Sequence, residues 1–146
     1  MNCIRQATSD DLARIAEIEI FNYRLNFYPI FQNDDYYFQE LQVPKLMQHY
    51  AAFLENTYVY DDGAVKGFIR LDGQQVVKLF VEPVLQGRSI GAKLLDYAVE
   101  HFNANTLWAL EKNTRAIAFY QRNGFHLTGE RIPEDDTDEF LVRMKR

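Results

Sequence analysis

The apolar positions along the chain follow a helical period first and a strand period later. After a loosely alternating run at residues 2–7, which predicts a first strand, they recur every three or four residues up to about Phe27 and predict a helix. A second helical region is expected at roughly 34–55, with an interruption near Pro44. The apolar positions of the first helix are Leu12, Ile15, Ile18 and Leu25.

From residue 57 onward the period becomes two. Three short runs rich in β-formers follow one another, at Thr57–Tyr60, Val65–Leu71 and Gln75–Val81. Between them lie Asp61-Asp62-Gly63 and Asp72-Gly73, which are hairpin turn signals. The three runs therefore predict an antiparallel meander.

The C-terminal part alternates helices and strands. The pattern predicts a helix from about Ile90 to Phe102, a strand at Thr106–Leu110, a helix at Asn113–Arg122, and strands at Phe125–Arg131 and Glu139–Met144. This order indicates the α+β class. We expect one domain, residues 1–146, with a mixed, mostly antiparallel sheet of about seven strands flanked by about four helices.

Composition narrows the class of protein. The 146 residues are 47% hydrophobic and 25% charged, as in an ordinary soluble domain that buries a core without staples. Cys3 is alone, so it forms no internal disulfide, and no run approaches the roughly 20 apolar residues of a membrane span. No signal peptide is visible, so we expect a cytoplasmic protein. The net charge of −5 argues against nucleic acid as a partner.

Two stretches concentrate the candidate chemistry. From Leu79 to Leu95 an apolar strand ends at a proline, crosses a turn and opens an amphipathic helix whose backbone N–H groups can hold phosphate. Gly87 and Gly91 allow close approach of the backbone, and Arg88 and Lys93 add positive charge. The alternative is a basic turn before a surface helix. The second stretch, residues 113–125, places the phenol of Tyr120 inside another helix, where it can protonate a bound group.

These stretches resemble the two motifs of the GNAT superfamily of acyl-CoA-dependent N-acyltransferases. In the first motif Gln86 takes the Gln or Arg place, Ser89 the first glycine place and Gly91 the second. Ser89 departs from the pattern, because its Cβ crowds the approach of a pyrophosphate, although its hydroxyl can donate a hydrogen bond. The second motif is matched by Asn113, Ala116, Phe119-Tyr120 and Gly124-Phe125. The rival dinucleotide-binding fold needs GxGxxG in a βαβ unit, which the meander does not supply.

The resemblance implies a sheet splayed between its fourth and fifth strands, with acetyl-CoA as cosubstrate and no metal. The backbone of Leu79, Phe80 and Val81 would pair with the pantetheine arm, and Asn113 would hydrogen-bond that arm. Tyr120 would lie near the thioester sulfur as the catalytic acid. The pyrophosphate would be held by the amide groups of Gln86, Gly87, Arg88, Ser89, Ile90, Gly91 and Ala92.

Two of these roles have structural alternatives, and the general base stays open. Tyr120 can be a packing residue, and Asn113 can cap its helix, a role compatible with ligand contact. Residues 74–80 contain neither carboxylate nor imidazole, so the base is Glu82, Glu111 or water. None of the three histidines, His49, His101 and His126, has a partner at catalytic spacing, and no metal-ligand pattern occurs.

The acceptor is expected at the aromatic segment 21–60. Its aromatic faces and its acids would suit a cationic amine, small-molecule or peptide, although core packing explains most of the aromatics as well. Residues 134–139 form an acidic loop that is either a solvated hairpin tip or a guide for a basic substrate. The acids in or near the aromatic segment are Glu17, Glu19, Asp34, Asp35 and Glu40. The resemblance thus predicts direct acetyl transfer to a primary amine without an acyl-enzyme, and leaves open a non-catalytic acyl-CoA-binding or sensor module and a homodimer.

Overall fold

A computed structural model describes residues 2–146. Within these residues one seven-stranded sheet has the order β1-β2-β3-β4-β5-β7-β6. All neighbours are antiparallel except β4 and β5, so the sheet is mixed and mostly antiparallel, as predicted. The strands are β1 (Ile4–Gln6), β2 (Thr57–Asp61), β3 (Val65–Asp72), β4 (Gln75–Val81), β5 (Thr106–Leu110), β6 (His126–Pro133) and β7 (Phe140–Lys145).

A capping interaction precedes the first helix. A 3-10 turn at Ser9–Asp11 leads into α1 (Leu12–Asn26), and the Asp11 carboxylate accepts from the Thr8 backbone N–H at 2.8 Å. The four-residue α2 (Tyr28–Phe31) follows. A π-helix (Asp35–Glu40), which the sequence pattern did not predict, precedes α3 (Val43–Ala51).

The second helical region is interrupted at residues 41–42, just before Pro44, as the sequence predicts. Pro44 lies in the first turn of α3, where its missing N–H needs no partner, so it marks the start of a helix. Two further helices, α4 (Ile90–Phe102) and α5 (Thr114–Arg122), complete the set. The part of the chain described thus has five α-helices and a π-helix, more than the four or so expected. None of these helices is long and apolar enough to cross a membrane.

The helices cover the two faces of the sheet, and the period of two along the strands separates the two cores. On β4, Leu79 and Val81 face the core beneath α4, whereas Phe80 packs in the core beneath α1 and α3. Buried residues of the α4 core include Ile69, Leu94, Leu95, Leu107 and Met144. Those of the α1 and α3 core include Ile15, Ile18, Tyr50, Val59 and Phe68.

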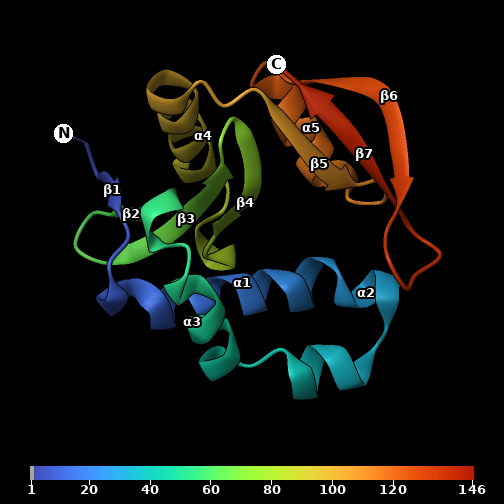
Figure 1. Ribbon diagram of the computed structural model, residues 1–146, viewed down its shortest axis with the longest axis horizontal. Helices are drawn as coiled ribbons and strands as arrows, with labels where there is room; N and C mark the ends of the chain where they lie inside the picture. Colours follow the sequence, from blue (N-terminus) through green and yellow to red (C-terminus); the bar gives the residue numbers. More distant parts are fainter. Residues whose placement is uncertain (1) are drawn as a thin grey trace.

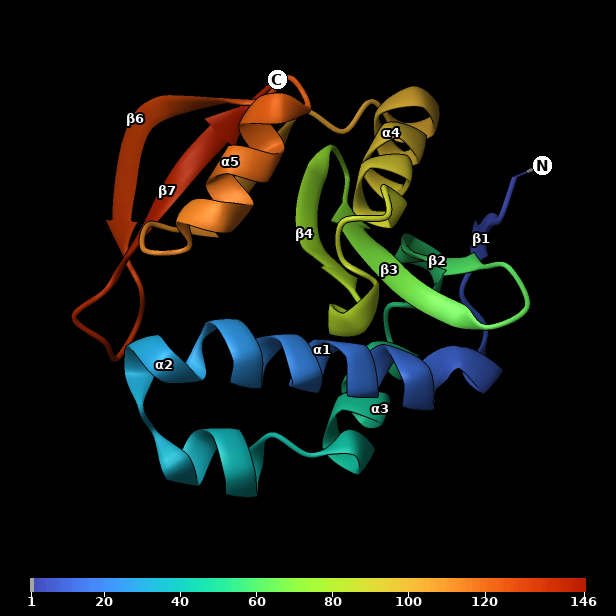
Figure 2. The same cartoon turned by 180° about the vertical axis from the view of Figure 1, so that it is seen from behind.

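The sheet opens between β4 and β5. These parallel strands pair only at Gln75–Thr106 and Val76–Leu107, so the rest of β4 has no neighbour on that side. In Figures 1 and 2 the two strands diverge from this pairing toward α1, and α4 and α5 flank the opening on one face. The predicted splay between the fourth and fifth strands is confirmed, and it leaves the backbone of residues 79–81 with a free edge.

Candidate functional site

A hollow of about 400 Å³ lies at this opening. It is lined by the end of α1, the free edge of β4, the turn into α4 and one face of α5. The predicted site residues that line it are Leu79, Phe80, Val81, Gln86, Gly87, Ser89, Ile90, Gly91, Ala92, Asn113 and Tyr120. Arg88 is the exception, because it is exposed and does not line the hollow. The fold therefore gathers both sequence motifs around one cavity.

The turn into α4 presents unused backbone donors. Between Gly87 and Ala92 no backbone N–H donates a hydrogen bond to an acceptor in residues 2–146, and the first to do so is that of Lys93, to the Ser89 carbonyl at 3.0 Å. Unpaired N–H groups at a helix N-terminus carry partial positive charge. Such a turn binds phosphate groups.

Ser89 adopts a conformation that favours glycine. Its φ of +66° is left-handed, as is the +87° of Gly87 two residues earlier. A side chain in this region costs about 1–2 kcal/mol, which gives a physical reason for a glycine at this place of the motif. The Ser89 hydroxyl makes no hydrogen bond within residues 2–146, so it remains available to a ligand.

The positive charge of the hollow comes from α5. Arg115 and Arg122 line it, no Asp or Glu does, and neither arginine forms an ion pair within residues 2–146. Lys93, expected to supply charge, lies 5.9 Å from the Tyr60 ring and outside the hollow. The missed signal is the seven-residue spacing of the two arginines, which places them on one face of the helix.

The free edge of β4 directs backbone groups into the opening. Glu82 N–H donates to the Lys66 carbonyl of β3 at 2.9 Å. Because antiparallel pairs alternate, we infer that the N–H and carbonyl of Val81 and of Leu79 point away from β3. The Val81 carbonyl accepts from Asn22 Nδ2 at 2.9 Å. The Val81 N–H has no such partner and stays available at the hollow.

Asn22 is a further residue that sequence reasoning missed. It is 2% exposed and donates to the carbonyls of Ile18 and Val81 at 2.8 and 2.9 Å. Its Oδ1 accepts from Gln86 Nε2 at 3.1 Å, so one side chain joins α1, the end of β4 and the turn into α4. The signal was available: Asn22 follows Ile15 and Ile18 on the same face of α1, where an apolar residue is expected.

Tyr120 lines the hollow with an unused hydroxyl. Its ring packs edge-on against Phe119 and Phe125, at centroid distances of 5.2 and 5.9 Å. Within residues 2–146 the hydroxyl has no hydrogen-bond partner, and burial raises the pKa of the phenol. The phenol is therefore protonated at neutral pH and can donate to a group in the hollow.

Asn113 caps α5 and lines the same hollow. Its Oδ1 accepts from the Ala116 backbone N–H at 3.2 Å, the geometry of a helix N-cap. The side-chain amide of Asn113 makes no hydrogen bond within residues 2–146, so it can contact a ligand while the oxygen caps the helix. The two roles weighed for this residue are thus compatible.

The candidate bases are engaged elsewhere. Glu82 accepts from Arg14 at 3.0 Å, and Glu111 accepts two hydrogen bonds from Arg131 at 2.9 Å, which lower the pKa of the Glu111 carboxyl. No Asp, Glu or His lines the hollow. In the described residues no group of three or more His, Cys, Asp or Glu side chains is placed to hold a metal ion. Water remains the candidate base.

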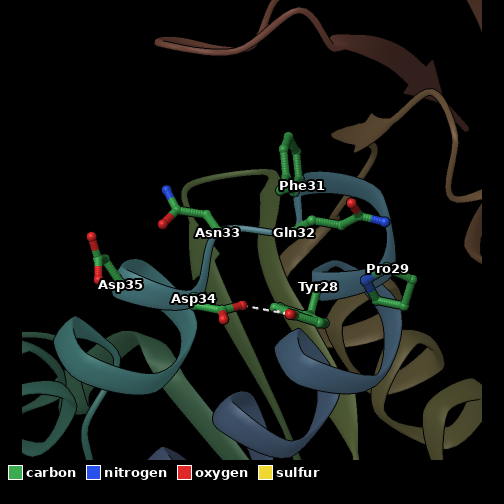
Figure 3. Close-up of a pocket in the computed structure, with 7 residues that line it drawn as sticks. All are labelled: Tyr28, Pro29, Phe31, Gln32, Asn33, Asp34 and Asp35. Carbon is green, nitrogen blue, oxygen red and sulfur yellow. Dashed lines mark hydrogen bonds between the residues drawn. The ribbon is translucent and has the colours of Figure 1, made fainter.

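A larger hollow, of about 700 Å³, lies at the end of α2 and is a different kind of feature. The hydroxyl of Tyr28 donates to Asp34, and the remaining side chains point away from one another (Figure 3). Most of its lining residues are exposed, Asp34 and Asp35 among them. It offers no convergent groups for chemistry.

The acidic loop faces the aromatic segment. Burial raises the pKa of Tyr23 and of Tyr36, and the negative charge of Glu134 adds a smaller contribution to each. Figures 1 and 2 show the loop between β6 and β7 reaching the end of α2. Among the acids of the segment, Glu19 is buried and accepts from the Tyr50 hydroxyl. Several of the aromatics are core residues, as the alternative interpretation had it.

Comparison with known sequences identifies a matching family. The profile described as acetyltransferase (GNAT) domain matches residues 53–127. A curated relative, the peptidyl-lysine N-acetyltransferase YjaB of Salmonella typhimurium, is 34% identical over 77 residues, 53% of each chain. The peptidyl-lysine N-acetyltransferase YiaC of Escherichia coli is 33% identical over 86 residues, 58% of this chain and 59% of that one. The chain spans about half the length of these relatives.

A solved structure agrees over nearly the whole chain. The apo form of YjaB from Escherichia coli superposes with a TM-score of 0.72 and 24% identity, over 97% of this chain and 95% of that one. At this identity the likeness establishes the fold.

Proposed function

Because the chain belongs to the GNAT acetyltransferase family, we propose that it transfers an acetyl group from acetyl-CoA to a primary amine. The observation that carries the proposal is the single hollow at the splay, where the unpaired N–H groups of the turn, the free edge of β4 and the hydroxyl of Tyr120 meet. Separately these features are common. Together they match a ligand with a pyrophosphate at one end and a thioester at the other.

The residues present fit this cosubstrate. N–H groups from Gly87 to Ala92 hold the pyrophosphate, and Arg115 and Arg122 neutralise its charge. The free edge of β4 pairs with the amide-bearing pantetheine arm as an additional strand would. Asn22 keeps that edge and the turn in register, because it holds both through hydrogen bonds.

The chemical step is direct attack. The amine, deprotonated through water, attacks the thioester carbonyl carbon, and the Val81 N–H donates to the oxyanion that develops. The carbon–sulfur bond then breaks, and Tyr120 gives its proton to the departing sulfur. No residue is acylated, which agrees with the absence of any Ser or Cys other than Ser89 from the lining of the hollow.

For the acceptor we propose the amine of a peptide lysine. The support is the name of the curated relatives, which are peptidyl-lysine N-acetyltransferases. The acidic loop between β6 and β7, which reaches the end of α2, also favours a cationic substrate. The protein is further proposed to act in the cytoplasm.

A thiol-release assay tests the proposal. With acetyl-CoA and lysine peptides we expect free thiol above the hydrolysis background measured without amine. CoA alone should raise the melting temperature, because it binds only the folded state. The absence of both a thermal shift and a calorimetric signal at saturating CoA would contradict the assignment of acetyl-CoA as cosubstrate.

A thermal shift without amine-dependent thiol release would instead support the non-catalytic acyl-CoA-binding module. One observation favours that second function, namely that no carboxylate or imidazole lines the hollow. The Tyr120 hydroxyl, which a binding module does not need, favours the enzyme.

A further inference from the structure

Two cations face each other on the α1 side of the sheet. Arg70 of β3 and Lys78 of β4 are directly opposite in the antiparallel register. Phe68 and Phe80, two residues from each, pack in the core beneath α1 and α3, so the alternation puts both cations on that face. Like charges directly opposite destabilise a strand pair, so this arrangement needs a compensating interaction.

No carboxylate of the described residues forms a close ion pair with either cation. Eight close ion pairs occur in residues 2–146, and neither Arg70 nor Lys78 takes part in one. Other arginines are paired: Arg131 binds Glu111, and Arg143 binds Glu130. Within the same residues, Arg70 shares this lack of a carboxylate partner with Arg115 and Arg122 of the hollow.

Aromatic and imidazole groups hold the two cations in position instead. The guanidinium of Arg70 lies 3.6 Å from the Phe53 ring centroid and donates from Nη1 to His49 Nε2 at 3.2 Å. Lys78 Nζ donates to the hydroxyl of Tyr23. Contacts of this kind fix a cation without cancelling its charge.

The guanidinium keeps an unused edge. Nε and Nη2 of Arg70 donate to no acceptor in residues 2–146, and Nε is shielded from solvent. Because Nε is closed to solvent, Nη2 is the unused donor that a carboxylate can reach, and the resulting hydrogen bond would be charge-assisted. The nearby Glu19 does not bind Nη2, because its Oε1 accepts from Tyr50 and it lies beyond ion-pair distance.

The pair lies beside the reaction site. Phe80, two residues beyond Lys78 on β4, lines the hollow, and Tyr23 packs against Phe80 at 5.6 Å while binding Lys78. Two strand residues span about 6.6 Å. A substrate with an anion held at Lys78 would therefore need several bonds between that anion and an amine at the thioester end of the hollow.

We propose that Arg70 and Lys78, with His49 orienting the guanidinium, form a subsite for a carboxylate of the acceptor. The inference rests on the proposed acetyl transfer and specifies its substrate class: a primary amine joined to a carboxylate by several bonds. Lysine meets this description in two ways, through its own α-carboxylate when it is free or C-terminal, and through an acidic neighbour within a peptide.

Matched acceptors test the proposal. Nα-acetyl-lysine is compared with Nα-acetyl-lysinamide, which lacks only the carboxylate, and the peptide amide acetyl-Gly-Lys-Glu with acetyl-Gly-Lys-Gln. We expect kcat/KM for the carboxylate-bearing member of at least one pair to be about 10- to 100-fold higher, mostly through KM. The first pair reports a terminal carboxylate and the second an acidic neighbour.

Lys78→Met keeps the apolar stem and removes the charge. It should bring the ratio of kcat/KM within the discriminated acceptor pair close to one, and leave kcat/KM for the acceptors without the carboxylate nearly unaffected. Lys45→Met removes an exposed lysine of α3 outside the cluster and should keep the ratio. Equal kcat/KM within both acceptor pairs in the unaltered protein would overturn the subsite, whatever the variants do. Absence of acetyl transfer to every amine would instead contradict the proposed function.

Discussion

Replacing Tyr120 by phenylalanine isolates the role of one proton. The hydroxyl has no hydrogen-bond partner within residues 2–146, so its removal breaks no contact and the ring keeps its packing on Phe119 and Phe125. We expect the free energy of unfolding to change by less than about 0.5 kcal/mol. CoA affinity should also stay, because the phosphate and pantetheine groups bind elsewhere in the hollow.

The turnover number should fall. General acid catalysis contributes roughly 10²- to 10⁴-fold, or about 3–5 kcal/mol of barrier. The lower end applies here, because a thiolate with a pKa of about 8.5 leaves acceptably without a proton. A loss of about 100-fold in kcat, with the KM for acetyl-CoA unchanged, is therefore the expected result.

The assay is thiol release under single-turnover conditions, where chemistry and not product release is measured. Tyr97→Phe is the matched control, because Tyr97 lies on α4 outside the hollow and packs against Tyr58 and His101. Burial raises the pKa of Tyr120, so the unaltered protein should lose no activity through this group below pH about 10. A kcat within twofold of the unaltered protein would refute the role of Tyr120 as acid and leave it a packing residue.

Three further changes probe the site and its support. Gly91→Glu should abolish CoA binding measured by calorimetry, whereas Gly91→Gln should only weaken it. An added Cβ at residue 91 meets Phe119 at an ordinary 3.4 Å, so the two variants differ mainly in the charge that repels the pyrophosphate. Equal CoA affinities of the two variants would exclude the turn as the phosphate site. Asn22→Ala should lower the free energy of unfolding in urea by about 1–3 kcal/mol and weaken CoA binding, because the Val81 carbonyl loses its hydrogen-bond partner. An unchanged free energy of unfolding would contradict this structural role of Asn22. Burial raises the pKa of Tyr50 far above the value of about 10 in the unfolded chain, so the protonated phenol stabilises the fold fully below pH about 10, and this contribution is lost as pH rises beyond that value. Tyr50→Phe should therefore flatten the fall of melting temperature at high pH. An unchanged slope would contradict this role of Tyr50.

Local pattern determined most of the elements. The strands at Gln75–Val81 and Thr106–Leu110 have the bounds that their periodicity predicts, because alternation and helical spacing reflect neighbours only a few residues apart. The π-helix at Asp35–Glu40 was missed, since its extra residue per turn has no spacing signature of its own. The interruption near Pro44 was predicted correctly, because a proline is disfavoured in a helix interior and fits the first turn of a new helix.

The candidate site divides in the same way. The motifs located the turn into α4 and Tyr120, because a phosphate turn and a capped helix are local structures. Only tertiary structure places Asn22 against Val81, brings Arg122 into the hollow, leaves Arg88 outside it and sets Arg70 opposite Lys78. The physical reason is that these contacts join segments far apart in the chain. Strand register and helix rotation set them, and no short window of sequence contains either quantity.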